Sequence, residues 1–103
     1  MTTTRIERDG AFHFHVVGEM TFSTTTMLLQ QSETFFSGSQ DVEIDLSQVT
    51  AADSAGLALL LEWKAVAAHK GVQVAVKEIP GDMLSIAHLC QIDSLFEDSE
   101  TGG

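Results

Sequence analysis

The chain has 103 residues, of which 44% are hydrophobic and 19% are charged, a composition typical of one folded domain with one modest core. Its 15 acidic and 5 basic residues give a net charge of −10, which argues against binding to nucleic acid or directly to an anionic membrane. One cysteine excludes an intramolecular disulfide. No apolar run suits a membrane span or a signal peptide, so we expect a cytoplasmic protein without direct membrane insertion.

The amino-terminal segment predicts a β-hairpin. Asp9-Gly10, a strong hairpin-turn signal, separates residues 5–8 from residues 11–17. Side chains alternate between two faces over residues 11–17, as in a half-buried strand, and Gly18 is expected to end this strand.

A helix and a second strand are predicted next. Ser23 is a candidate N-cap, apolar residues follow at helical spacing, and Gly38 stands where a terminating glycine belongs. Residues 42–46 alternate again and predict a short strand. Small and polar side chains over residues 47–53 predict a loop after it.

The second half predicts a long helix, a strand and a last helix. Residues 54–70 contain no helix breaker except Gly56, and Gly71 is expected to stop this helix. Residues 72–76 carry alternating valines and predict a strand. Pro80 suits the first turn of the following helix.

This order of elements predicts an α/β fold with a four- to five-stranded mixed, mainly parallel sheet and helices packed mostly on one face. We expect a single domain over residues 1–103. In it, Cys90 is a small core residue of the last helix and residues 92–96 close the core in a short turn. Residues 97–103 are expected to form a flexible acidic tail.

The junction between the predicted loop and the long helix is the most unusual segment. In open parallel sheets, ligands and partners bind at the carboxyl ends of the strands. Asp53 or Ser54 would cap the helix there, and we expect one to cap while the other faces solvent. A phosphate on Ser54 would lie at the positive end of the helix dipole, so Ser54 is a candidate phosphorylation site.

The long helix carries two apolar stripes when its residues are placed at about 100° per residue. One stripe contains Trp63 and is expected to face the sheet. The other contains Leu57 and Leu61. It is either a partly exposed patch that binds a partner, or a second buried stripe under the last helix, and the sequence leaves both alternatives open.

The sequence resembles the STAS domain, a module of sulphate transporters and anti-sigma-factor antagonists. The resemblance covers nearly the whole chain and implies the fold described above and a non-enzymatic binding function without a cofactor. The matching segments are Gly18-Glu19-Met20, Ile44-Asp45-Leu46-Ser47, Asp53-Ser54-Ala55-Gly56-Leu57 and the Pro80 helix with Leu95-Phe96.

Within this family, Thr21-Phe22 and residues 56–63 look like the small subunit of the Mla phospholipid transporter. That branch implies an accessory subunit that binds the ABC-type ATPase of a transporter maintaining outer-membrane lipid asymmetry, and so lies at the inner membrane through its partner. Ser54 would supply a polar contact and two leucines the apolar anchors. The implied partner-binding residues are Asp53, Ser54, Gly56, Leu57 and Leu61.

The alternative branch is the anti-sigma-factor antagonists, in which a partner kinase would phosphorylate Ser54 and so switch binding to an anti-sigma factor. That branch usually carries an Asp where this chain has Thr21, so the resemblance favours the transporter reading.

Motifs for enzymatic chemistry are absent from the sequence. It contains no nucleophile elbow, no phosphate-binding loop and no Cys/His pair at metal-ligand spacing, so we expect neither catalysis nor a bound metal. His13 and His15 share one face of a predicted strand without a third ligand, and we expect them on a solvated face.

Overall fold

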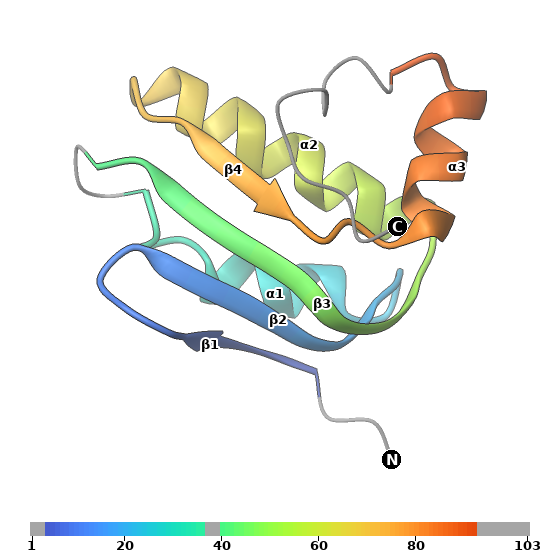
Figure 1. The fold of residues 1–103 in the computed structure, drawn as a ribbon, viewed down its shortest axis with the longest axis horizontal. Helices are drawn as coiled ribbons and strands as arrows, with labels where there is room; N and C mark the ends of the chain where they lie inside the picture. Colours follow the sequence, from blue (N-terminus) through green and yellow to red (C-terminus); the bar gives the residue numbers. More distant parts are fainter. Residues whose placement is uncertain (1–3, 37–39, 93–103) are drawn as a thin grey trace.

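The computed structural model describes residues 4–36 and 40–92, and these form an α/β fold (Figure 1). In chain order the elements are β1 (Arg5–Arg8), β2 (His13–Met20), α1 (Thr25–Gln31), β3 (Val42–Ala52), α2 (Ser54–His69), β4 (Val74–Lys77) and α3 (Gly81–Leu89).

The four strands of the described residues lie in one sheet in the order β1-β2-β3-β4. β1 pairs antiparallel with β2, whereas β2–β3 and β3–β4 are parallel. Figure 1 shows α1 and α2 on one face of this sheet and α3 near the carboxyl ends of the parallel strands. The prediction of a mixed, mainly parallel sheet with helices mostly on one face is confirmed.

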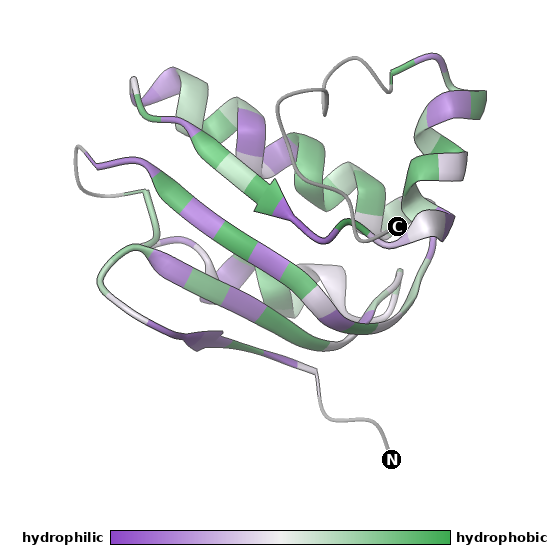
Figure 2. Ribbon diagram, viewed as in Figure 1, coloured by the Kyte–Doolittle hydropathy of each residue, from purple (hydrophilic) through white to green (hydrophobic). Residues whose placement is uncertain are grey.

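The hydrophobic core lies between the sheet and the helices. Figure 2 shows hydrophilic and hydrophobic residues alternating along β2 and β3, because successive side chains of a strand point to opposite faces. Trp63 of α2 is 1% exposed and belongs to the same buried cluster as the inward side chains of the strands, as expected. These strand residues are Phe14, Val16, Met20, Val42, Ile44, Leu46, Val74 and Val76.

Two strands are longer than the sequence predicts. β2 does not end at Gly18, because its pairing with β3 continues to Met20 and Ala52. Gly18 has a φ of 101° and lies at a shift in the β2–β3 register. Because β3 also runs to Ala52, the predicted loop over residues 47–53 is wrong. The backbone hydrogen bonds between the two parallel strands stabilise this segment despite its small and polar side chains.

The first helix is shorter than predicted. Its N-cap is Thr24 rather than Ser23, and it ends at Gln31, well before Gly38, which lies outside the described residues. The chain turns after Gln31 so that Phe35 stacks on Phe14, with ring centroids 3.8 Å apart. The chain packs these aromatic rings together instead of continuing the helix.

The second half follows the prediction more closely. α2 spans Ser54–His69 with Lys70 as its C-cap, and Gly71 follows with a φ of 75°. α3 begins after Pro80. Cys90, however, is exposed at the carboxyl end of α3 and is not a core residue. Ile92 packs against the core, whereas the rest of the predicted terminal turn and tail lies outside the described residues.

Candidate partner-binding site

The candidate site lies where β2 and β3 end and α2 begins (Figure 1). The Asp53 amide donates a hydrogen bond to the Met20 carbonyl oxygen at 3.3 Å, so the end of β2 contacts the start of α2. The turn between β2 and α1 therefore lies beside the amino terminus of α2.

Asp53 connects these two segments through both of its carboxylate oxygens. Its Oδ1 accepts from the Ala55 amide at 2.9 Å and from the Gly56 amide at 3.3 Å, which caps α2. Its Oδ2 accepts from the Phe22 amide at 3.1 Å, which fixes the turn after β2. The expectation that one residue of the Asp53-Ser54 pair caps the helix is confirmed, and Asp53 is that residue.

Ser54 is the first residue of α2 and is exposed. Its hydroxyl makes no hydrogen bond within residues 4–36 and 40–92. The amides of Ala55 and Gly56 already donate to Asp53. A phosphate on Ser54 would therefore meet the Asp53 carboxylate at a helix terminus whose first donors are occupied.

Gly56 allows α2 to approach the sheet closely. A Cβ at this position would lie 2.3 Å from the Met20 carbonyl oxygen and 3.0 Å from the Met83 Cε of α3. Gly56 thus has a packing role beneath the site, and no larger residue fits without displacing backbone.

Leu57 and Leu61 do not form the exposed patch that was one of the two alternatives. Leu57 is 4% exposed and belongs to the buried cluster that includes Met83 of α3, and Leu61 is partly buried against this cluster. The structure supports the alternative in which α3 covers this stripe. A buried Leu57 cannot be a surface anchor in this conformation.

Other apolar residues are exposed near Ser54. Phe22, in the turn after β2, is 84% exposed, and Leu29 of α1 is 39% exposed. They border a groove of about 540 Å³ between α1 and α2, which we call the α1–α2 groove. Its lining residues are Phe22, Thr25, Thr26, Leu29, Ala55, Ala58, Leu59 and Glu62.

Phe22, Leu29 and Glu62 were not predicted from the sequence as site residues. Phe22 is the one apolar residue in a run of threonines and serine and belongs to no predicted apolar stripe. This pattern is the sequence signal from which its exposure could have been predicted. Leu29 and Glu62 fit ordinary helix patterns, and only the packing of α1 beside α2 brings them together.

Metal binding and membrane crossing find no support in the described part of the chain. It contains no group of three or more His, Cys, Asp or Glu side chains that would hold a metal ion. None of its helices is long and apolar enough to cross a membrane.

This sheet, with a capped Asp-Ser helix start at the carboxyl ends of its parallel strands, defines a STAS domain. The structure is similar to that of the anti-sigma factor antagonist SpoIIAA in its unphosphorylated form, with a TM-score of 0.66. The match covers 96% of this chain and 87% of that chain at 12% sequence identity, and so concerns the fold. The family model described as "Mlab, STAS domain" matches residues 4–97, and the chain belongs to this family. A search of curated proteins gives no match.

Proposed function

We propose that this STAS domain is a non-enzymatic accessory subunit that binds the ATPase of an Mla-like ABC phospholipid transporter. The observation that carries this proposal is the apolar α1–α2 groove, bordered by exposed Phe22 and Leu29, beside the exposed residue Ser54. Membership of the MlaB family supports a transporter partner, and STAS domains typically bind or regulate other proteins. Binding would hold the domain at the cytoplasmic side of the inner membrane, where the transporter maintains lipid asymmetry.

Phe22 is the main apolar anchor of this proposed interface. A partner that covers this exposed phenylalanine would remove apolar surface from water, which favours binding. Its backbone is fixed by the hydrogen bond to Asp53, and the preceding Thr21 amide donates to Thr24 Oγ1 at 2.9 Å. Because this turn is already ordered, little conformational entropy is lost when a partner packs on Phe22.

The residues predicted from sequence keep roles in this proposal, although not all of them contact the partner. Ser54 supplies the polar contact beside the groove. Asp53 and Gly56 position the amino terminus of α2, whereas Leu57 and Leu61 support the helix from below.

The shape and charge of the groove indicate the chemistry of the partner segment. The groove has apolar walls contributed by two helices, which suits an amphipathic helix with an apolar side chain between Phe22 and Leu29. Glu62 lies at the groove, is exposed, and has no ion-pair partner among the described residues. Together with the net charge of −10, this favours a Lys or Arg on the partner helix.

The bound domain would stabilise the assembled state of the ATPase by about 1–3 kcal/mol, the usual range of coupling between sites. The corresponding readout is ATP hydrolysis by the transporter with and without the domain.

The direct test measures binding of the domain to the purified ATPase subunit of the host's Mla-type transporter. Phe22→Asp and Ser54→Arg should each weaken binding by at least about 30-fold, as expected for central interface residues. Leu89→Asp is the matched control, because Leu89 is 81% exposed on α3, away from the groove. Circular dichroism verifies that each variant is folded. Wild-type affinity of both groove variants would contradict the proposal.

The second candidate function is a phosphorylation-switched antagonist of an anti-sigma factor. The exposed hydroxyl of Ser54 is the observation in its favour. It predicts a mass increase of roughly 80 Da for one phosphate in protein isolated from its host, which Ser54→Ala removes. A pull-down from detergent-solubilised membranes distinguishes the two functions. Recovery of an ATPase with its permease supports the first, and recovery of a soluble kinase supports the second.

A further inference from the structure

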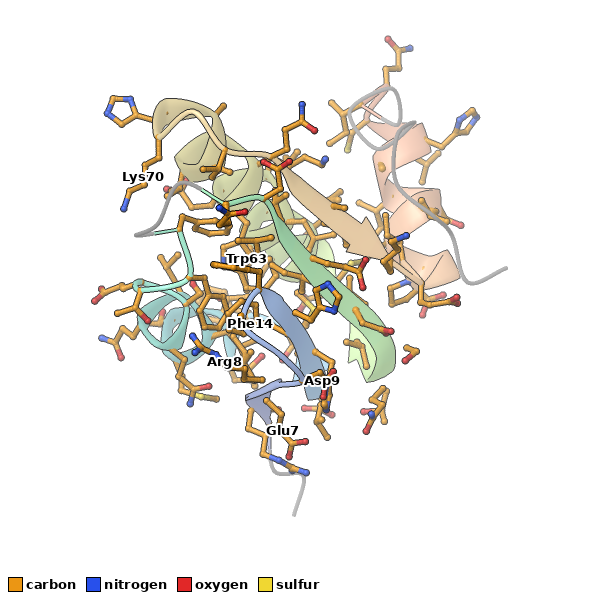
Figure 3. All side chains as sticks on the ribbon, turned by 60° about the vertical axis from the view of Figure 1, so that its left-hand side comes forward. Glu7, Arg8, Asp9, Phe14, Trp63 and Lys70 are labelled. Atoms are coloured by element: carbon orange, nitrogen blue, oxygen red, sulfur yellow. The ribbon has the colours of Figure 1, made fainter. Side chains whose placement is uncertain are left out.

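The face of the sheet opposite the helices carries a histidine held between two carboxylates. His15 of β2 was expected on a solvated face, yet its side chain is only 11% exposed. Its Nδ1 lies 2.5 Å from Asp9 Oδ2 in the β1–β2 turn, and its Nε2 lies 2.9 Å from Glu7 Oε1 of β1. Figure 3 shows Glu7 and Asp9 on one side of the hairpin and Arg8 beside Phe14 on the other.

This arrangement favours the protonated form of the ring. An ionised carboxylate only accepts hydrogen bonds, so both ring nitrogens of His15 must donate. Only the imidazolium form has two N–H groups. In its imidazolium form, His15 is the cation of a three-residue cluster that joins a strand, a turn and the neighbouring strand.

The electrostatics agree with this geometry. The hydrogen bond to Asp9 raises the pKa of His15, burial opposes the increase, and the hydrogen bond to Glu7 adds to it. Hydrogen bonds from Arg5 and then from His15 lower the pKa of Glu7. The charged state of each partner thus favours the charged state of the other.

Charged groups on the neighbouring strands complete the surroundings of His15. Asp45 of β3 is its register partner, and Lys77 of β4 is the register partner of Asp45. On β2 itself, His13 points to the same face and pairs in register with Glu43, which lies 3.8 Å from Lys77. Figure 1 shows α1 and α2 on the opposite face, so no charge from these helices faces the ring.

We propose that His15 is a pH-sensitive clasp that holds the amino-terminal hairpin closed while its ring is protonated. Loss of the proton removes the charge and leaves one of the two carboxylates without a donor. β1 is the edge strand, so the turn and the outer strand then lose a charged side-chain link to β2 in addition to their backbone pairing. This inference does not depend on the proposed partner of the domain.

The direction of the pH dependence follows from linkage. The pKa of His15 is higher in the folded protein than in the unfolded chain, where it is about 6.5. The clasp therefore contributes its full stabilisation below about pH 6.5 and loses it as the pH rises through the folded-state pKa. A rise in pH through the folded-state pKa of His15 therefore releases the hairpin, whereas a fall in pH towards about 6.5 strengthens the clasp.

NMR titration of the full chain tests the clasp directly. The ring nitrogens of His15 should both be protonated at neutral pH, and Asp9→Asn should lower the pKa of His15. Asp82→Asn changes the net charge equally, but Asp82 is exposed on α3, so this variant should leave the titration of His15 in place. A single protonated nitrogen at neutral pH, or an identical response to both variants, would overturn the proposal.

Stability measurements provide the second readout. The unfolding free energy of the wild type, measured relative to His15→Gln, should fall as the pH rises from about 6 to about 9. His13→Gln is the matched control, because this exposed neighbour should preserve the pH dependence of the wild type. If His15→Gln retains that pH dependence, the proposed clasp is contradicted. If this variant does not fold, the titration of His15 in Asp9→Asn still tests the proposal.

Discussion

Single residues at the amino terminus of α2 connect parts of the chain that are distant in sequence. Asp53 caps its own helix, which a Ser/Asp start predicts, but it also binds the amide of Phe22, 31 residues away. Local patterns carry no information about such a contact. The sequence therefore predicted the capping role but not the hydrogen bond by which the same side chain fixes the turn at the exposed Phe22.

Gly56 provides a prediction at this scale. Gly56→Ala should reduce the free energy of unfolding by about 3 kcal/mol, the upper end for overpacking, because the added methyl group would meet the Met20 carbonyl. The change is measured by urea denaturation.

Gly81→Ala is the matched control for this experiment. Gly81 lies in the first turn of α3 with nothing within 4 Å of an added Cβ, so alanine should stabilise the helix by up to about 1 kcal/mol. Equal effects of the two substitutions would contradict the close approach of α2 to β2.

Helices and strands were predicted well where hydrophobic periodicity and glycine or proline signals coincide. α2 and α3 follow such signals, whereas β3 extends beyond its alternating segment because β2 pairs with residues 48–52. The two stripes of α2 show the same limit. Helical spacing identifies both, but only the packed fold shows that Leu57 is buried.

The contact between α1 and α2 provides a prediction at the scale of elements. Trp63 Nε1 donates to Ser32 Oγ at 2.8 Å, and both residues are buried. Ser32→Ala should cost about 1–3 kcal/mol, because it leaves the indole N–H without an acceptor. The measurement is chemical denaturation followed by circular dichroism.

A double-mutant cycle separates this hydrogen bond from general packing. In the background of Trp63→Phe, which has no indole N–H, Ser32→Ala should cost clearly less. The same cost in both backgrounds would show that the hydrogen bond does not link the two helices energetically.

The whole molecule combines a strongly acidic charge with helices on one face of the sheet. The sequence predicted both features, and the family resemblance is confirmed by the match over residues 4–97. The position of the groove was not predictable, because it depends on two helices meeting after the sheet has placed them.

Charge leads to a prediction for the proposed binding to the ATPase. Glu62→Lys should slow association at low salt by about tenfold, and added salt should reduce the difference from wild type. Asp82→Lys changes the net charge by the same amount on α3, away from the groove, and should have a smaller effect. Stopped-flow association at several salt concentrations is the measurement. If both variants behave alike, Glu62 makes no specific contact with a cation.

The pairing of β2 with β3 also has a consequence for the order of folding during synthesis. These central strands are parallel and separated in the chain by α1, so their contacts require closure of a long loop. The β1–β2 hairpin needs only its short turn. As the chain leaves the ribosome, the hairpin is therefore the first part of the sheet that can form. The centre of the sheet must wait until β3 has emerged.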